Sequence, residues 1–304
     1  MAVSGIAGAA YVSDEDFGDL LALLFPDPEA RCAMLTAYMD ESATPDDEHP
    51  MIAVGGGVGT GLQWERLLRA WRSVLDPEGI EIFHTSEYES PGGREGSIYK
   101  TWPDQKLRDF GNALIRAIQD NKPEMAFVAC VPVFEFNQVR YPDGTSRHLR
   151  LDDRYFLCAY LCLEQISLWA GNLFGPSSRI TYFFETDGPH ERQMRDAYKV
   201  IAQSDSWSRR LKFWREPTLS PKDGQPGLQI ADKFVYEGAK HASHFLVGNP
   251  PPQHTLTLPD GTKVWRTRYP TEQLVLSGLD VHTRMYTAQD IEKVFAEWKQ
   301  IDET

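Results

Sequence analysis

The sequence predicts an α/β protein in which helices flank a mixed β-sheet, with an extension at each end of the chain. Hydrophobic residues make up 41% of the 304 residues and aromatic residues 12%, which is typical of a packed globular protein. Short β-prone apolar runs alternate with amphipathic helical segments along most of the chain. The apolar run from Leu20 to Pro26 is far shorter than the ~20 residues that span a bilayer, so we expect no membrane partner.

The net charge of the chain disfavours some classes of function and fits others. The chain carries 31 Lys and Arg against 44 Asp and Glu, a formal charge of −13. A module that holds duplex DNA mainly through its phosphates is usually basic, so this class is disfavoured. An acidic enzyme that recruits divalent cations fits, because a bound metal ion reverses the local field. Acidic residues near the N-terminus and four scattered cysteines favour a reducing cytoplasm over export.

Three regions are expected from the local patterns. Residues 1–30 form an N-terminal helical extension, in which Ser13 caps a short helix that Pro26 ends. Residues 31–248 form the α/β core. Residues 249–304 form a hairpin and a helix packed on that core, since an Asp-Gly pair at Asp260 is typical of a hairpin turn.

Short runs of apolar or β-branched residues predict the strands. The first strand covers residues 32–39 and ends at Asp40, and a second over 51–58 is its expected hairpin partner. Three consecutive glycines in the second, Gly55 to Gly57, indicate a bulge or a close backbone approach, and they match no phosphate-binding glycine loop. Further strands are expected at the run IEIF from residue 80 and over residues 124–131, 179–184 and 209–216.

Apolar residues spaced three and four apart predict the helices. One such pattern, with Leu67, Leu68, Trp71 and Leu75 as its apolar residues, covers residues 62–75, and Pro103 marks the start of a helix over 104–119. A long and mainly apolar helix is expected at the centre of the fold, where Cys158 and Cys162 lie one turn apart as buried thiols. The predicted helices beyond the first two cover residues 153–174, 190–203, a segment that begins at Gly227, and 287–300.

Acidic side chains stand at the ends of separate elements. Asp40 and Glu41 end the first strand, and Glu185 and Asp187 follow the strand over 179–184. Asp232 lies in a helix among mostly apolar neighbours, where a carboxylate without a partner is costly to bury. Mg²⁺ and Mn²⁺ prefer such oxygen ligands, and a pair of these ions can activate water against a phosphodiester. The alternative for each strand-end acid is a solvated turn former.

Four segments carry a resemblance: AYMDESA at residues 37–43, EIFHTSEY at 81–88, YFFETDG at 182–188 and GLQIADKFVYEGAKH at 227–241. In this order they resemble the bacterial family named domain of unknown function 3800, over roughly residues 33 to 245. That family is similar to the ribonuclease H-like fold. Ala43 stands where the family usually has glycine after Asp-Glu-Ser.

The resemblance implies a ribonuclease H-like α/β fold and a metal-dependent nuclease-like site. Asp40 is implied as the central metal ligand, Glu185 or Asp187 as the ligand from the next strand, and Asp232 as the ligand from the helix. The implied cofactor is Mg²⁺ or Mn²⁺.

His84 matches the family's Phe-His element, with a role as general acid, proton shuttle or substrate contact. Glu41 and Glu87 are secondary candidates. Adjacent residues of a strand face opposite ways, so we do not expect Asp40 and Glu41 to share one metal ion. A satisfied buried histidine is the alternative for His84.

A basic and aromatic run over residues 207–215 offers a candidate nucleic-acid surface. Phosphate attraction and base stacking together suit a single strand. The alternative is an edge strand protected by charge. The four basic candidates are Arg209, Arg210, Lys212 and Arg215.

These observations favour a metal-dependent hydrolase that cleaves phosphodiesters, with nucleic acid as its substrate. A non-catalytic binding or interaction module of the same fold, acting as a homodimer or with a protein partner, is the second hypothesis. A small-molecule phosphohydrolase is the third, because it needs the same carboxylates.

Overall fold

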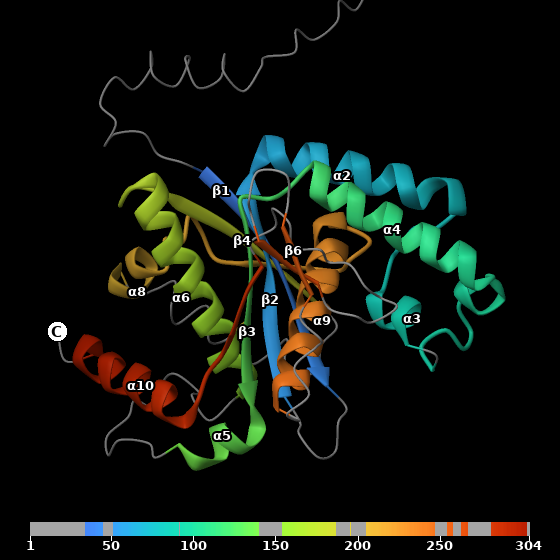
Figure 1. The fold of residues 1–304 in the computed structure, drawn as a ribbon. Helices are drawn as coiled ribbons and strands as arrows, with labels where there is room; N and C mark the ends of the chain where they lie inside the picture. Colours follow the sequence, from blue (N-terminus) through green and yellow to red (C-terminus); the bar gives the residue numbers. More distant parts are fainter. Residues whose placement is uncertain are drawn as a thin grey trace, which may run out of the picture.

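The computed structural model describes residues 34–44, 51–90, 92–139, 154–186, 195, 205–246, 254–257, 263–266 and 281–302. Within them the chain forms the expected α/β architecture, a six-stranded mixed sheet with helices on both faces (Figure 1). The expected N-terminal extension over 1–30 and, apart from residue 195, the expected helix over 190–203 lie outside the described residues.

The sheet has the strand order β5-β4-β1-β2-β3-β8. Strand β2 is antiparallel to both of its neighbours, β1 and β3. Strand β4 runs parallel to β1, β5 parallel to β4, and β8 parallel to β3. Parallel neighbours end at the same edge of a sheet, so the carboxyl ends of β4 and β5 lie together. Strand β1 continues past them to Thr44, so the predicted end of the first strand at Asp40 is wrong. The strands are β1 Met34–Thr44, β2 Met51–Thr60, β3 Met125–Pro132, β4 Arg179–Glu185, β5 Thr218–Ser220 and β8 Val281–Met285.

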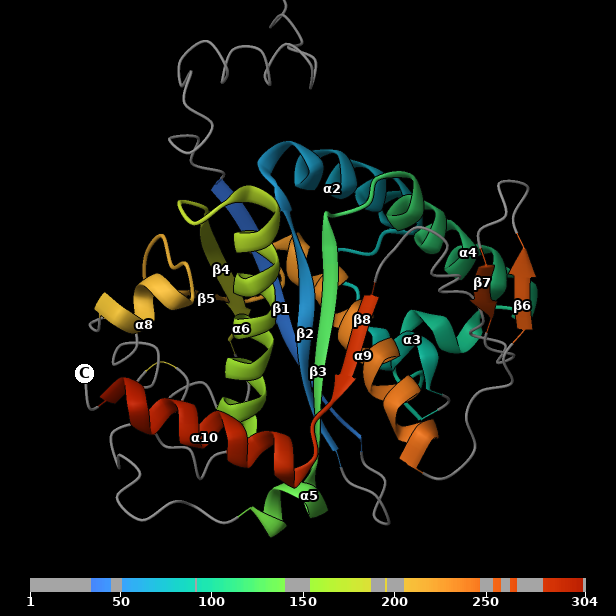
Figure 2. The same ribbon diagram turned by 60° about the vertical axis from the view of Figure 1, so that its left-hand side comes forward.

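Helices cover the two faces of the sheet unequally. One face carries α6, Arg154–Phe174, and the other carries α9, Pro226–Leu246, beside α2, α3 and α4 (Figure 2). The described residues contain no helix with the length and apolar character that a bilayer crossing requires. The remaining elements are α2 Gly61–Leu75, η2 Asp76–Glu78, α3 Thr85–Glu89, η3 Ile98–Thr101, α4 Asp104–Asp120, α5 Val133–Gln138, α8 Asp205–Arg210, the hairpin of β6 His254–Thr257 with β7 Lys263–Arg266, and α10 Ala288–Asp302.

The helix α6 is buried nearly all round, as its continuous apolar sequence predicts. Cys158 and Cys162 lie in this core as free thiols, which confirms the prediction for both. Burial raises the pKa of the Cys158 thiol to about 12, so it stays protonated and packs as a small apolar group.

Two predicted strands are wrong. The segment from Ile80 runs without strand pairing into α3, because its backbone bonds to a side chain of α9 instead of to a strand. The run over 209–216 contains the end of α8 and a turn at Lys212, whose φ of 55° is left-handed, with one isolated bridge at Phe213. Strands β5 and β8 and helix α5 were not predicted, since each is short and depends on neighbours distant in sequence.

The three glycines of β2 mark a close backbone approach without a bulge. The pairing of β1 with β2 runs from Leu35 opposite Thr60 to Thr44 opposite Met51 with no skipped residue. A Cβ atom on Gly56 would overlap the carbonyl oxygen of Tyr38 on β1. Position 56 therefore accepts no side chain.

Gly56→Ala is expected to destabilise the protein by about 3 kcal/mol, because the added methyl group forces β1 and β2 apart. Gly61→Ala is the matched control, since a Cβ at Gly61 meets no atom within 4 Å. Urea unfolding of both variants measures the difference. Equal stability of the two variants would contradict the close approach.

Candidate functional site

The register of β1 and β4 brings two acids side by side. Tyr38 lies opposite Phe183 in the parallel pairing, with the two rings stacked at 5.1 Å between centroids. Alternate residues of a strand share a face, so Asp40 and Glu185, two positions further along, follow these rings on the α9 side of the sheet. The two acids therefore do meet, although Asp40 lies within β1 and not at its end.

Asp232 reaches the same place from α9. The helix packs closely on β1, where a Cβ atom on Gly227 would overlap the Tyr38 ring. Asp232 Oδ2 accepts a hydrogen bond of 2.8 Å from the backbone amide of Thr85. This bond fixes the carboxylate between the helix and the segment that enters α3.

Lys222 lies at the point that the three acids share. Its Nζ is 3.0 Å from Asp40 Oδ2, 3.0 Å from Glu185 Oε2 and 3.5 Å from Asp232 Oδ2. The side chain is only 8% exposed. Lys222 follows β5, and β5 is parallel to β4, so it arises from the same sheet edge as Asp40 and Glu185.

Lys222 is not among the site residues that the sequence predicts. It stands in the run SPKDGQPG, whose Pro and Gly residues predict a loop, and lysines of loops are usually solvated. The available signal was its position directly before the GLQIAD helix, ten residues ahead of Asp232 in the sequence. Its burial depends on the β4–β5 pairing, which the sequence did not predict.

The cluster holds more negative than positive charge. Three carboxylates surround one ammonium group, so the ionised cluster has two negative charges in excess. Burial raises the pKa of Asp40 well above its ordinary value, Lys222 opposes this, and Asp232 and Glu185 raise it further. Burial lowers the pKa of Lys222, but the three carboxylates more than offset this, so it stays charged.

Gln229 connects the segments around the cluster. Its side chain is 1% exposed, and its Oε1 accepts from the amide of Phe83 at 3.2 Å and from Trp71 Nε1 at 3.4 Å. Its Nε2 lies 3.3 Å from the carbonyl oxygens of Glu81 and Lys222. One buried amide thus joins the Lys222 turn, α2 and the segment leading to α3, which holds the backbone of Lys222 in place.

The other predicted site residues lie differently. His84 is half-buried directly before α3, between Phe83 and Thr85, whose amides bond to α9, and it makes no hydrogen bond or ion pair with the three acids. Glu41 pairs with Val54, which packs on the α6 side, so it faces away from Asp40 as expected. Glu87 is exposed on α3. Asp187 lies outside the described residues.

The donor chemistry of the cluster fits Mg²⁺ or Mn²⁺, although no ready-made cage exists. All three acids offer carboxylate oxygens, and Asp40 Oδ2 is buried without a hydrogen-bond donor of good geometry. The described residues contain no group of three or more His, Cys, Asp or Glu already arranged to hold a metal ion. The ammonium group of Lys222 lies at the position that such a group would surround.

Arg210 and Lys212, from the predicted nucleic-acid surface, contact other parts of the protein. Arg210 bonds to Glu164 of α6 at 2.5 Å, and the largely buried Lys212 lies 3.1 Å from the carbonyl oxygen of Pro176. Arg209 and Arg215 are exposed. Because the segment is not a strand, the four side chains do not alternate between two faces as expected.

A second buried ion cluster supports α3. Lys233 Nζ lies 2.5 Å from Glu89 Oε1 and 2.8 Å from Glu237 Oε1. Burial raises the pKa of Glu89, while Lys233 opposes this. The cluster ties α3 to α9 next to Asp232, so it holds the Thr85 amide in position.

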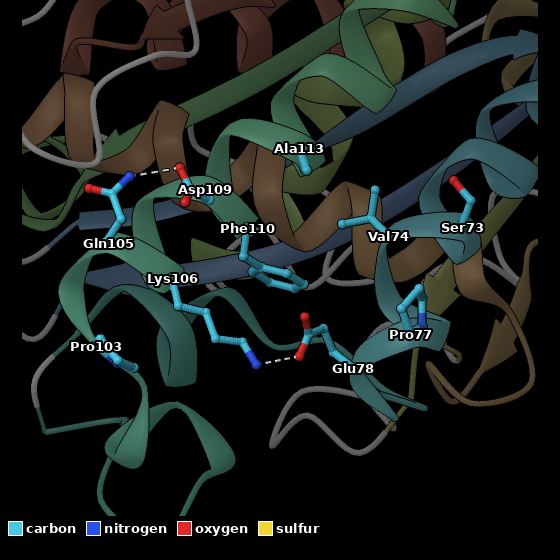
Figure 3. Close-up of a pocket in the computed structure, with 10 residues that line it drawn as sticks. All are labelled: Ser73, Val74, Pro77, Glu78, Pro103, Gln105, Lys106, Asp109, Phe110 and Ala113. Carbon is cyan, nitrogen blue, oxygen red and sulfur yellow. Dashed lines mark hydrogen bonds and ion pairs between the residues drawn. The ribbon is translucent and has the colours of Figure 1, made fainter.

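A groove between α2 and α4 lies apart from these clusters. Its volume is about 700 Å³, and Figure 3 shows Lys106 and Glu78 joined across it. The lining residues include none of the three acids and not Lys222. Nothing in its lining suggests the chemistry of the charged cluster.

Lys233→Met is expected to lower stability by about 3–5 kcal/mol at neutral pH, because Glu89 then lies buried without its cation. In this variant the pKa of Glu89 rises further above its ordinary value of 4.5. Between these two pKa values, Glu89 is protonated in the folded state and ionised in the unfolded state. The deficit is therefore smallest near pH 4.5 and grows as the pH rises through the raised pKa. Urea unfolding at pH 5 and pH 8 measures this, and a deficit independent of pH contradicts it.

Asp40→Asn is expected to stabilise the chelator-treated protein by about 1 kcal/mol at pH 7, because it removes one of the crowded negative charges. If Asp40 served only to stabilise the fold, its replacement would lower the stability of the protein instead. Thermal unfolding of the wild type and the variant with a chelator present shows whether the variant is more or less stable. A clear loss of stability would assign Asp40 a purely structural role.

No family model, no curated protein and no solved structure matches this chain.

Proposed function

We propose that this chain is a divalent-metal-dependent nuclease that hydrolyses phosphodiester bonds with Mg²⁺ or Mn²⁺. We further propose a ribonuclease H-like architecture, as the resemblance to the family named domain of unknown function 3800 implies. The strand order β3-β2-β1-β4-β5, antiparallel over the first three strands and parallel over the last three, supports this architecture.

One observation carries the proposal. Asp40, Glu185 and Asp232 are distant in sequence and come from β1, β4 and α9, yet all three lie within 3.5 Å of one atom. Burying like charges together costs stability, and natural proteins retain such clusters mainly at functional sites. The cluster also lies where the parallel strands β4 and β5 end, and α/β proteins bind ligands at the carboxyl ends of such strands.

Each group has a definable task. A bound divalent ion supplies a Lewis acid for the phosphoryl oxygen and lowers the pKa of water. Asp40, Glu185 and Asp232 would offer it carboxylate oxygens, and the Thr85 amide keeps Asp232 oriented. Lys222 offers positive charge to a phosphate oxygen. Exposed Arg209 and Arg215 are the members of the basic run that we propose for phosphate contacts outside the cluster.

The second candidate is a non-catalytic interaction module of the same architecture. Lys222 favours it, because an internal cation already partly neutralises the three acids. In that case the cluster would serve the fold alone, and the protein would bind no divalent ion.

The test is cleavage of labelled single- and double-stranded DNA and RNA by the purified chain with Mn²⁺. We expect a chelator to abolish cleavage. Asp40→Asn and Asp232→Asn should each reduce the rate by about a hundredfold or more, because each removes an oxygen ligand.

Glu65→Gln is the matched control. Glu65 is an exposed acid on α2 paired with Arg69, and its loss should leave the rate unchanged. Cleavage by Asp40→Asn at the wild-type rate would contradict the nuclease proposal. Absence of cleavage of all four substrates, together with absence of Mn²⁺ binding, would support the interaction module.

A further inference from the structure

Lys222 is the unexpected member of the cluster, and its distances decide what can occupy its position. Its Nζ lies 3.0 Å from Asp40 Oδ2 and from Glu185 Oε2, which is normal for an ammonium and a carboxylate. Mg²⁺ binds its oxygens at about 2.0–2.1 Å, so the same point is about 1 Å too far from each acid for this ion. The distances at this position therefore suit the ammonium group of a lysine and not a magnesium ion.

The lysine is also fixed there. Gln229 bonds to the carbonyl oxygen of Lys222, and the side chain is buried. Asp40 Oδ1 already accepts from the amide of Glu41 at 2.7 Å, and Asp232 Oδ2 accepts from Thr85. Among the described residues, no N–H donor engages Glu185 Oε1 or Asp232 Oδ1.

Charge balance limits the number of metal ions. The ionised cluster has two negative charges in excess, which one divalent ion cancels. A second divalent ion would leave two positive charges in a buried site. Glu185 Oε1 and Asp232 Oδ1, with Asp40 Oδ2 shared with Lys222, suffice for one ion that keeps several waters, as Mg²⁺ prefers, and not for two.

We propose that Lys222 permanently takes the place of one of the two metal ions of a two-metal phosphodiesterase, so that the chain binds a single divalent ion beside the lysine. This inference rests on the proposed function, and it makes the ammonium of Lys222 the second positive charge at the phosphate. An ammonium is a compact point charge and can serve there without a ligand cage.

The test is a count of bound Mn²⁺ on the metal-depleted full chain, by calorimetric titration and electron paramagnetic resonance. The wild type should bind one ion per chain and give the spectrum of an isolated Mn²⁺. Lys222→Met should bind two ions, spin-coupled at the ~3.5–4 Å spacing of two-metal sites, because the cluster loses a positive charge and gains space. Lys106→Met, which removes a lysine paired with Glu78, should still bind one.

The outcomes separate this inference from the proposed function. Two ions in the wild type overturn the inference and leave the nuclease proposal standing. No ion in the wild type, with no cleavage, overturns both. One ion in both the wild type and Lys222→Met would show that Lys222 does not occupy a second metal position, and would overturn the inference. If Lys222→Met fails to fold, Lys222→Gln, which keeps a polar side chain, takes its place and should bind a second ion. The number of ions bound by the wild type and by Lys222→Gln then decides the inference.

Discussion

The buried excess of negative charge around Lys222 is the constraint on which the rest of the site depends. Asp40 and Glu185 lie next to each other because β1 and β4 are parallel and in register, and Asp232 joins them from α9. Such a cluster tolerates burial only with a cation inside it, and Lys222 supplies that cation at about 3 Å from two of the acids. The turn before α9, the Gln229 bonds and the Thr85 amide all serve to hold these four groups together.

The surrounding packing explains why the arrangement is rigid. Strand β1 approaches β2 so closely that position 56 accepts only glycine, and it approaches α9 so closely at Tyr38 that the same holds for position 227. The stacked rings of Tyr38 and Phe183 lie directly behind the acids. The second ion cluster, centred on Lys233, fixes α3 to the same helix. A site whose side chains are held by packing and by second hydrogen bonds needs little rearrangement when it binds a ligand.

A lysine among metal-binding carboxylates changes the chemistry that can be expected. The lysine neutralises part of the charge without needing a cage of ligands, whereas a metal ion needs several oxygens at short distance. A nuclease with this arrangement would combine one exchangeable cation with one built into the chain. The same arrangement in a protein that binds no ion would be an ordinary, if costly, buried ion cluster.

The sequence by itself determined the elements with strong periodicity. Apolar patterning located α2, α4, α6 and the strands β1 to β4 to within a few residues, because such patterns reflect which side of an element faces the core. It also singled out Asp40, Glu185 and Asp232 by their positions at element ends and in an apolar helix. These three proved to be neighbours, since the parallel strand ends and α9 converge on one edge.

Only the tertiary structure decided the rest. Lys222 enters the site because the three-residue strand β5 pairs with β4, and so short a strand has no periodicity of its own. The segment after Ile80 became irregular because Gln229 and Asp232 take up its backbone amides, a competition between residues almost 150 positions apart in the chain. The basic run likewise turned away from a strand, because Arg210 and Lys212 bond to partners on and just after α6. Local sequence carries no record of such distant partners.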